Sequence, residues 1–349
     1  MGMTPALITL GSNLGDRRAT FKRAIADLDA APGVVVRAVS RYHTTAPVGG
    51  PGGQGAFLNA AAALEVTLDP FELHRLLLEI ERRAGRVREV RWDARTLDLD
   101  LILFGDRIID SPDLTVPHPR FAVRRFVLAP MAKVAPHARD PITHRTVREL
   151  LAQLDRRPGL VAIDRGADPG LARSIALDVA ERLDAGPPLD LHQGISAGDR
   201  DPNELTDSER YELTLERLDR IEATARLLDA ERTRVRKSAP SSWLVSDCDL
   251  SRELDRASMI LFPEPPDGPT TMAGNPRRLL IRAAEVAGAI QGAPSPTVAV
   301  ILGWDRPYRD LGESSRGGAL LVPESGDREG IVSEVLAACE ASRSGSGSA

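Results

Sequence analysis

Residues 86–104 read RVREVRWDARTLDLDLILF, and this stretch decides both the expected fold and the expected chemistry. Its last eight residues, 97–104, are apolar except for Asp98 and Asp100, which predicts a buried strand. Side chains at i and i+2 share a face of a strand, so the two carboxylates lie side by side, opposite the leucines. Such a pair favours a bound cation, and its hard oxygens suit Mg²⁺. The alternative is a pair of solvated carboxylates on the open face of a sheet.

Four arginines precede the acidic pair within a dozen residues: Arg86, Arg88, Arg91 and Arg95. Cations beside a metal-binding acidic pair make sense when a polyphosphate shares the site. Phosphoryl transfer depends on this kind of positioning and charge neutralisation and needs little covalent chemistry from the protein. The alternative interpretation of the arginines is a surface ion-pair network.

The segments on either side of this stretch predict an α+β domain. Strands are expected at 6–10, 33–42, 57–67 and 97–104, and helices at 16–30 and 69–85. Asp16 and Asp69 are placed to cap the two helices, and Gly85 to end the second. The resulting order β-α-β-β-α-β is typical of the ferredoxin-like fold. Two further helices are expected, one ending at Ala135 and one over 146–154.

Length and charge predict two domains. The chain has 349 residues, and residues 1–157 hold 23 Lys and Arg against 18 Asp and Glu, whereas the remainder holds 22 against 32. We expect the ferredoxin-like domain over 1–157, a second α/β domain over 158–340 and a disordered tail over 341–349. The opposite charges of the two parts favour their docking within one molecule.

Composition excludes several classes of protein. With 42% hydrophobic and 27% charged residues, the chain is neither fibrous nor wholly disordered. The sequence has no long apolar run or signal peptide, and the two cysteines, Cys248 and Cys339, lack metal-ligand spacing. We therefore expect a cytoplasmic protein without a membrane partner. The basic excess of the first part is too small, and aromatic residues at 4% are too few, for a nucleic-acid partner.

Four motifs resemble those of 6-hydroxymethyl-7,8-dihydropterin pyrophosphokinase, also called 2-amino-4-hydroxy-6-hydroxymethyldihydropteridine diphosphokinase. They are LGSNLG (10–15), FLNA (57–60), RW followed by RTLDLD (91–100) and VPHPRF (116–121). The resemblance covers residues 5–155 and agrees with the ferredoxin-like order. It implies an Mg²⁺-dependent enzyme of folate biosynthesis that moves diphosphate from ATP, its co-substrate, to a pterin alcohol and releases AMP.

The same resemblance implies roles for individual side chains. Two Mg²⁺ ions would be held by Asp98 and Asp100, and Glu81 would support the site. The catalytic set would be Arg86, Arg95, Asp98 and Asp100, and the ATP contacts would be His118, Arg124, Arg88 and Trp92. The pterin would lie between Phe57 and Phe126, with further contacts from Asn59, Thr45 and Val48.

The second part is less informative. The stretch GADPGLARS (166–174) follows an expected strand and opens an expected helix, as a phosphate-binding loop does. Leu171 and Ala172 stand where that loop has its second glycine and its lysine, so the loop would not hold phosphate as a working one does. Residues 207–211, before an expected long helix, and VSD (245–247) make the part faintly similar to a degenerate deoxynucleoside kinase. A kinase-like domain without catalysis, an unrelated α/β interaction domain and an active nucleoside-kinase-like enzyme all remain open. For the whole chain, the rival is a non-catalytic protein that binds pterin or nucleotide.

Overall fold

The computed structural model of the chain describes residues 2–48, 55–85, 95–164, 169–189, 206–239, 242–246, 286, 297–301, 319–321, 323 and 327–343. The first sheet has five antiparallel strands: β1 (Thr4–Ser12), β2 (Val34–Val39), β3 (His43–Thr45), β4 (Phe57–Val66) and β5 (Asp98–Phe104). The strand order is β2-β4-β1-β5, with β3 paired to β4. Without the short β3, this is the order of a ferredoxin-like βαββαβ unit, as the sequence predicts.

Two helices connect these strands, and both begin where the sequence places their caps. They are α1 (Arg17–Asp29) and α2 (Pro70–Arg83). The Asp16 side chain accepts a hydrogen bond from the backbone N–H of Ala19 at 3.0 Å. Asp69 and Glu72 form a reciprocal capping box. Local sequence is therefore sufficient to fix the start of each helix.

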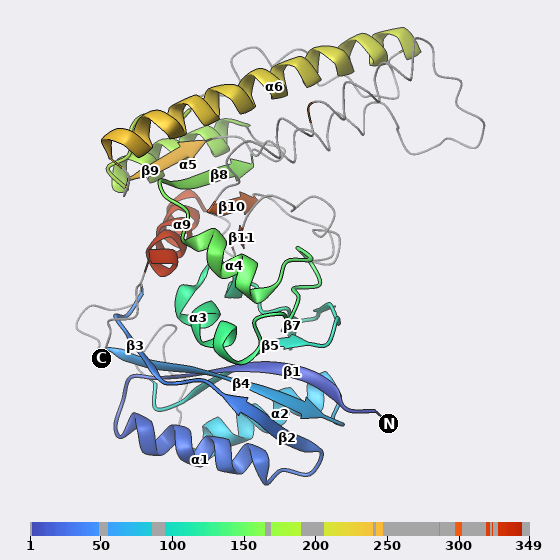
Figure 1. Cartoon of the computed structure of the whole chain (residues 1–349), viewed down its shortest axis with the longest axis vertical. Coiled ribbons are helices and arrows are strands. Elements are labelled where there is room, and N and C mark those ends of the chain that lie inside the picture. Colours follow the sequence, from blue (N-terminus) through green and yellow to red (C-terminus); the bar gives the residue numbers. More distant parts are fainter. Residues whose placement is uncertain are drawn as a thin grey trace.

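Helices cover both faces of this sheet (Figure 1). On one face, α1 and α2 bury Phe21, Leu28 and Leu77 against the strands. The other face packs against α3 (Arg125–Val134), with α4 (Val147–Leu154) beside α3. Because α3 lies on the face that carries the two aspartates, the alternative of carboxylates on an open sheet face does not hold.

The chain around α3 differs from expectation in two places. After β5 it forms a separate hairpin of β6 (Ile109–Asp110) and β7 (Thr115–Val116), which does not join the sheet. The helix expected after Pro117 begins only at α3, after a 3₁₀ turn, η1 (Phe121–Val123). Pro117 and Pro119 explain the delay, because each proline biases the residue before it towards an extended conformation.

The second part contains a parallel sheet. Its strands are β8 (Gly159–Asp164), β9 (Trp243–Ser246), β10 (Val298–Ile301) and β11 (Ala319–Leu321), in the order β11-β10-β8-β9. Its helices include α5 (Pro169–Arg182), α6 (Asp207–Ser238) and α9 (Arg328–Arg343). Gly159 allows β8 and β9 to approach, since a Cβ there would lie 2.4 Å from the Trp243 ring. Residues 165–168, which include the start of the stretch that resembles a phosphate-binding loop in sequence, lie outside the described residues.

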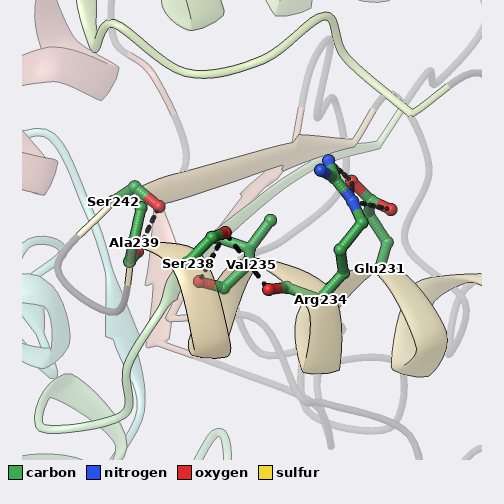
Figure 2. Close-up of polar contacts among 6 residues, drawn as sticks. All are labelled: Glu231, Arg234, Val235, Ser238, Ala239 and Ser242. Atoms are coloured by element: carbon green, nitrogen blue, oxygen red, sulfur yellow. Dashed lines mark hydrogen bonds and ion pairs between the residues drawn. The ribbon is translucent and has the colours of Figure 1, made fainter.

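The long helix α6 packs against β8 and β9. Its C-terminal end carries a local network of hydrogen bonds (Figure 2). The Ser238 hydroxyl donates to the backbone oxygen of Arg234 at 3.2 Å, and Arg234 pairs with Glu231 one turn earlier. The Ser242 hydroxyl donates to the backbone oxygen of Ala239 at 2.7 Å, just before β9 begins. The Ser238 bond runs to the carbonyl one turn earlier inside α6, and the Ser242 bond satisfies the carbonyl of Ala239, the residue after the helix.

One buried apolar cluster extends across both parts of the chain. It joins Leu128 and Leu150 of α3 and α4 to Val161 of β8 and Val335 of α9. The division after Arg157 therefore stays a prediction: the sheets separate there, but the cluster is continuous. Among the helices that the structure describes, none is long and apolar enough to cross a membrane.

Candidate active site

A pocket of about 270 Å³ opens at the edge of the first sheet, where β1, β4 and β5 meet the segment before α3. Ten of the side chains singled out in the sequence line it: Thr45, Val48, Phe57, Asn59, Arg95, Asp98, Asp100, His118, Arg124 and Phe126. Three others, Arg86, Arg88 and Trp92, lie outside the described residues. The pocket thus brings together groups that are up to 81 positions apart in the sequence, from Thr45 to Phe126.

The two aspartates lie on the pocket face of β5, opposite the central strand β1. Asp98 is paired with Gly11 and Asp100 with Thr9. Gly11 lines the pocket without a side chain, and a Cβ there would lie 3.6 Å from the Cβ of Asp98. The glycine therefore leaves the space beside Asp98 open. Leu99 and Leu101 point into the apolar core on the opposite face. The alternation expected from the sequence is therefore present.

The carboxyl of Asp100 is held in an environment that disfavours its negative charge. Desolvation, together with the nearby charge of Asp98, raises its pKa to about 7. Arg124 and Arg95 oppose this shift only in part. A divalent cation between the two carboxylates would relieve their repulsion, so the donor set fits Mg²⁺.

Arg95 is anchored by the first motif. Its backbone N–H donates to Asn13 Oδ1 at 2.6 Å, and its carbonyl accepts from the Asn13 N–H at 3.0 Å. Its guanidinium forms an ion pair with Asp98. The Gly-Ser-Asn-Leu-Gly turn therefore fixes the backbone of Arg95, which lies just before β5. The Arg95 guanidinium is thereby placed beside the acidic pair.

Arg124 gives one side of the pocket its positive charge, and the neutral ring of His118 lies on the same side. Desolvation, followed by the charges of Arg124 and Arg120, lowers the pKa of His118 to about 3. Its Nδ1 accepts a hydrogen bond from the backbone N–H of Arg120 at 3.2 Å, so the neutral ring carries its proton on Nε2. Desolvation also lowers the pKa of Arg124 to about 10, although the charge of Asp100 opposes the shift. The Arg124 guanidinium stays protonated at neutral pH.

The other end of the pocket is aromatic and amide-lined. Asn59 is buried on β4, and its Nδ2 donates to the hydroxyl of Thr45 on β3 at 2.8 Å. This bond leaves the amide oxygen of Asn59 able to accept from a ligand. Phe57 and Phe126 are half-buried at this end, and Arg124 lies 5.7 Å from the centre of the Phe126 ring.

Two features of the site have no clear signal in the sequence. Arg120 lines the pocket, yet no role is expected for it beyond its place in the fourth motif. Thr45 reaches the pocket through β3, a strand of three residues that the sequence pattern does not predict. Glu81, by contrast, is expected to support the site, and its carboxylate accepts from the Leu99 N–H at 2.7 Å between the two aspartates.

Residues 7–136 match the family model described as 7,8-dihydro-6-hydroxymethylpterin-pyrophosphokinase. The chain is 40% identical over 150 residues to the 2-amino-4-hydroxy-6-hydroxymethyldihydropteridine pyrophosphokinase of Synechocystis sp., covering 43% of this chain and 76% of the relative. It is 47% identical over 129 residues to that of Bacillus subtilis, covering 37% and 77%. For that of Pseudomonas aeruginosa the identity is 41% over 157 residues, covering 44% and 96%.

These relatives are matched over most of their own length, while more than half of this chain lies outside each alignment. The matched part carries the pocket and the four motifs. Through it, the chain belongs to the 7,8-dihydro-6-hydroxymethylpterin-pyrophosphokinase family.

Proposed function

We propose that the chain transfers diphosphate from ATP to 6-hydroxymethyl-7,8-dihydropterin, which gives AMP and the pterin diphosphate, a step of folate biosynthesis. The observation that supports this most strongly is the single pocket in which the acidic pair, the cationic groups and the aromatic groups meet. In the reaction, the pterin hydroxyl oxygen forms a bond to the β-phosphorus of ATP. The bond from that phosphorus to the oxygen of AMP breaks, and the hydroxyl proton is released.

The polyphosphate of ATP would lie at the cationic end of the pocket. The Nε2–H of His118 and the guanidinium groups of Arg124 and Arg95 would donate to phosphate oxygens, and Arg86, Arg88 and Trp92 are proposed as further contacts. Asp98 and Asp100 would hold two Mg²⁺ ions. Bound Mg²⁺ neutralises charge on the transferred phosphates and so lowers the barrier. Among the described residues, no group of three or more His, Cys, Asp or Glu side chains is arranged to hold a metal, and the proposal assigns two protein ligands.

The pterin would lie at the aromatic end. A flat heteroaromatic ring gains contact area from the half-buried Phe57 and Phe126, and its polar edge can donate to the Asn59 amide oxygen. Thr45 holds that amide in place, and Val48 adds an apolar contact. This arrangement would direct the hydroxymethyl group towards the acidic pair.

The second part is proposed as an accessory domain that docks on the first within one molecule. The buried apolar cluster shared by the two parts supports this docking. A degenerate kinase-like fold for residues 158–340 stays a proposal, because residues 165–168, which follow β8, lie outside the described residues. We also propose a cytoplasmic location, which the sparse and unpatterned cysteines favour: Cys339 is buried, and desolvation raises the pKa of its thiol to about 12.

An incubation of the purified full-length chain with ATP and Mg²⁺, with and without the pterin alcohol, tests the proposal. Chromatography of the nucleotides should show AMP that forms only when the pterin is present. ADP formation that ignores the pterin and responds to nucleosides would move the chemistry to the second part. If the protein binds ATP and pterin but yields no AMP, the chain is better described as a non-catalytic binding protein.

A further inference from the structure

Helix α9 of the second part packs against the wall of the pocket in the first part. It contacts η1, which begins at the last residue of the VPHPRF motif, and α3, which follows it. Figure 1 shows α9 next to α3. Arg125 of α3 donates from Nε to the backbone oxygen of Ser342, near the end of α9, at 3.1 Å. Two turns earlier on the same helix, Glu334 faces the pocket segment. The extension outside the family match therefore contacts the matched part directly at its pocket.

The contact nearest the pocket is an ion pair between Arg120 and Glu334. Nη2 of Arg120 lies 3.1 Å from Oε2 of Glu334, and the two side chains are only 11% and 14% exposed. A buried pair of this kind holds its two groups in one geometry, because neither charge has water to replace its partner. The carboxylate that fixes Arg120 thus comes from a residue 214 positions away.

Arg120 stands between this ion pair and the cationic end of the pocket. Its side chain lines the pocket, and its backbone N–H holds Nδ1 of His118. Its charge also acts on His118 and Arg124, lowering the pKa of each. A shift of the Arg120 side chain would therefore change the groups proposed to contact the ATP phosphates.

A small cavity of about 40 Å³ marks the same junction. Its walls include Arg124 and Phe126 from the pocket side and Glu334 and Ala338 from α9. The outer surfaces of two pocket side chains thus face the second part of the chain. The contacts of α9 thus lie behind Arg124, at the cationic end of the pocket, and behind Phe126, at the start of the aromatic end.

We propose that Glu334 is a positioning residue of the pyrophosphokinase site and acts through Arg120, so that the second part of the chain completes the ATP-binding end of the pocket. The inference rests on the proposed function. It assigns to the extension a role in the reaction of the first part that does not require any chemistry of its own.

Three variants of the full-length chain separate the position of the carboxylate from its charge. Glu334→Asp keeps the charge but shortens the reach, and Glu334→Gln keeps an oxygen at the same reach but removes the charge. Glu329→Asp is the matched control, because Glu329 also lies on α9 and pairs with Arg182, away from the pocket. Steady-state AMP formation gives KM for ATP, KM for the pterin and kcat for each, and thermal unfolding shows that each is folded.

If Glu334 positions Arg120, Glu334→Asp should raise KM for ATP by about tenfold, because the shorter side chain would shift the Arg120 guanidinium at the phosphate end of the pocket. KM for the pterin should change by less than about twofold, because the contacts run to the phosphate end. Glu334→Gln, which leaves the buried Arg120 guanidinium without its charged partner, should raise KM for ATP at least as much. Glu329→Asp should match the parent. Unchanged KM for ATP in folded Glu334→Asp and Glu334→Gln would overturn the inference, as would an equal rise of KM in the control Glu329→Asp.

A double-mutant cycle provides a second, independent check. If Glu334 acts through Arg120, Glu334→Asp should raise KM for ATP by less than about twofold in an Arg120→Met background. Effects that multiply would show that Glu334 acts elsewhere and would contradict the inference. A parent protein without pterin-dependent AMP formation would instead refute the proposed function, so the two failures are distinguishable.

Discussion

At the scale of single residues, the site brings together two carboxylates whose negative charges destabilise the folded state when no cation is bound. Asp98 and Asp100 stand on one face of β5 because side chains alternate along a strand. Their mutual repulsion and desolvation are evident in the raised pKa of Asp100. A site that binds a cation and a polyphosphate needs such carboxylates, although their charges lower the free energy of unfolding. Removing the charge of Asp100 should therefore stabilise the fold.

Asp100→Asn should raise the thermal stability of the protein at pH 8 by a few degrees. The pKa of Asp100 is about 7 in the folded chain against an ordinary 3.8, so the folded state holds a proton that the unfolded state releases. The cost of Asp100 is absent below about pH 4 and complete above about pH 7. The gain from Asp100→Asn should therefore shrink as the pH falls from about 8 to about 4. Thermal unfolding across this range measures it.

The exposed Asp106, in the turn after β5, is the control for that experiment. Asp106→Asn should leave the unfolding temperature almost unchanged at both ends of the pH range. A lower unfolding temperature for Asp100→Asn at pH 8 would contradict this prediction. It would show that contacts of the Asp100 carboxylate stabilise the folded state by more than its burial and repulsion destabilise it.

At the scale of elements, α2 and β5 are joined by one buried carboxylate. Glu81 lies in the last turn of α2 and accepts from the Leu99 N–H, in the middle of the acidic pair. Glu81→Ala would leave this N–H without its acceptor in a buried place, which costs about 1–3 kcal/mol. We expect both the unfolding temperature and kcat to fall, because the strand segment that carries Asp98 and Asp100 loses its anchor.

Glu81→Gln keeps an acceptor oxygen and should retain most of the stability that Glu81→Ala loses. Glu79→Gln on the same helix is the control, because the ion pairs of Glu79 with Arg82 and Arg83 are largely exposed and contribute little to stability. Equal kcat in Glu81→Ala and the parent would show that β5 is held in place without this contact.

The elements that sequence predicts well are those with local signals. The capping aspartates of α1 and α2 and the alternation of β5 are fixed within a few residues, so their positions follow from the sequence. The strand β3 and the hairpin β6–β7 have two or three residues each and exist because a neighbour pairs with them. Spaced motifs likewise bring Asp98, Asn59 and His118 to attention as site residues. The role of Arg120 depends on a tertiary partner, so no local pattern reveals it.

At the scale of the whole molecule, the two parts share one apolar cluster. Leu128 and Leu150 on one side pack in the same cluster as Val161 and Val335 on the other. In the sequence, the reason to expect docking is the opposite net charge of the two parts. The structure adds apolar packing and a buried ion pair at the junction, which net charge cannot reveal.

This continuity predicts a single cooperative unfolding transition for the full chain. Neither part can unfold without exposing apolar surface of the other, so both should lose structure together. Calorimetry should give one peak whose measured enthalpy equals the van't Hoff enthalpy. Two resolved transitions, with only one shifted to higher temperature by ATP and Mg²⁺, would contradict the shared core.

The transfer of diphosphate from ATP to a pterin alcohol in one pocket is tested most directly by phosphorus NMR of a reaction mixture. The mixture contains the protein, ATP, Mg²⁺ and 6-hydroxymethyl-7,8-dihydropterin. With the parent protein, AMP and a pterin-linked diphosphate should appear in equal amounts. Asp98→Asn should reduce their formation by about 10²–10³-fold or more. Inorganic phosphate and ADP as the only products, or full activity in Asp98→Asn, would contradict this function.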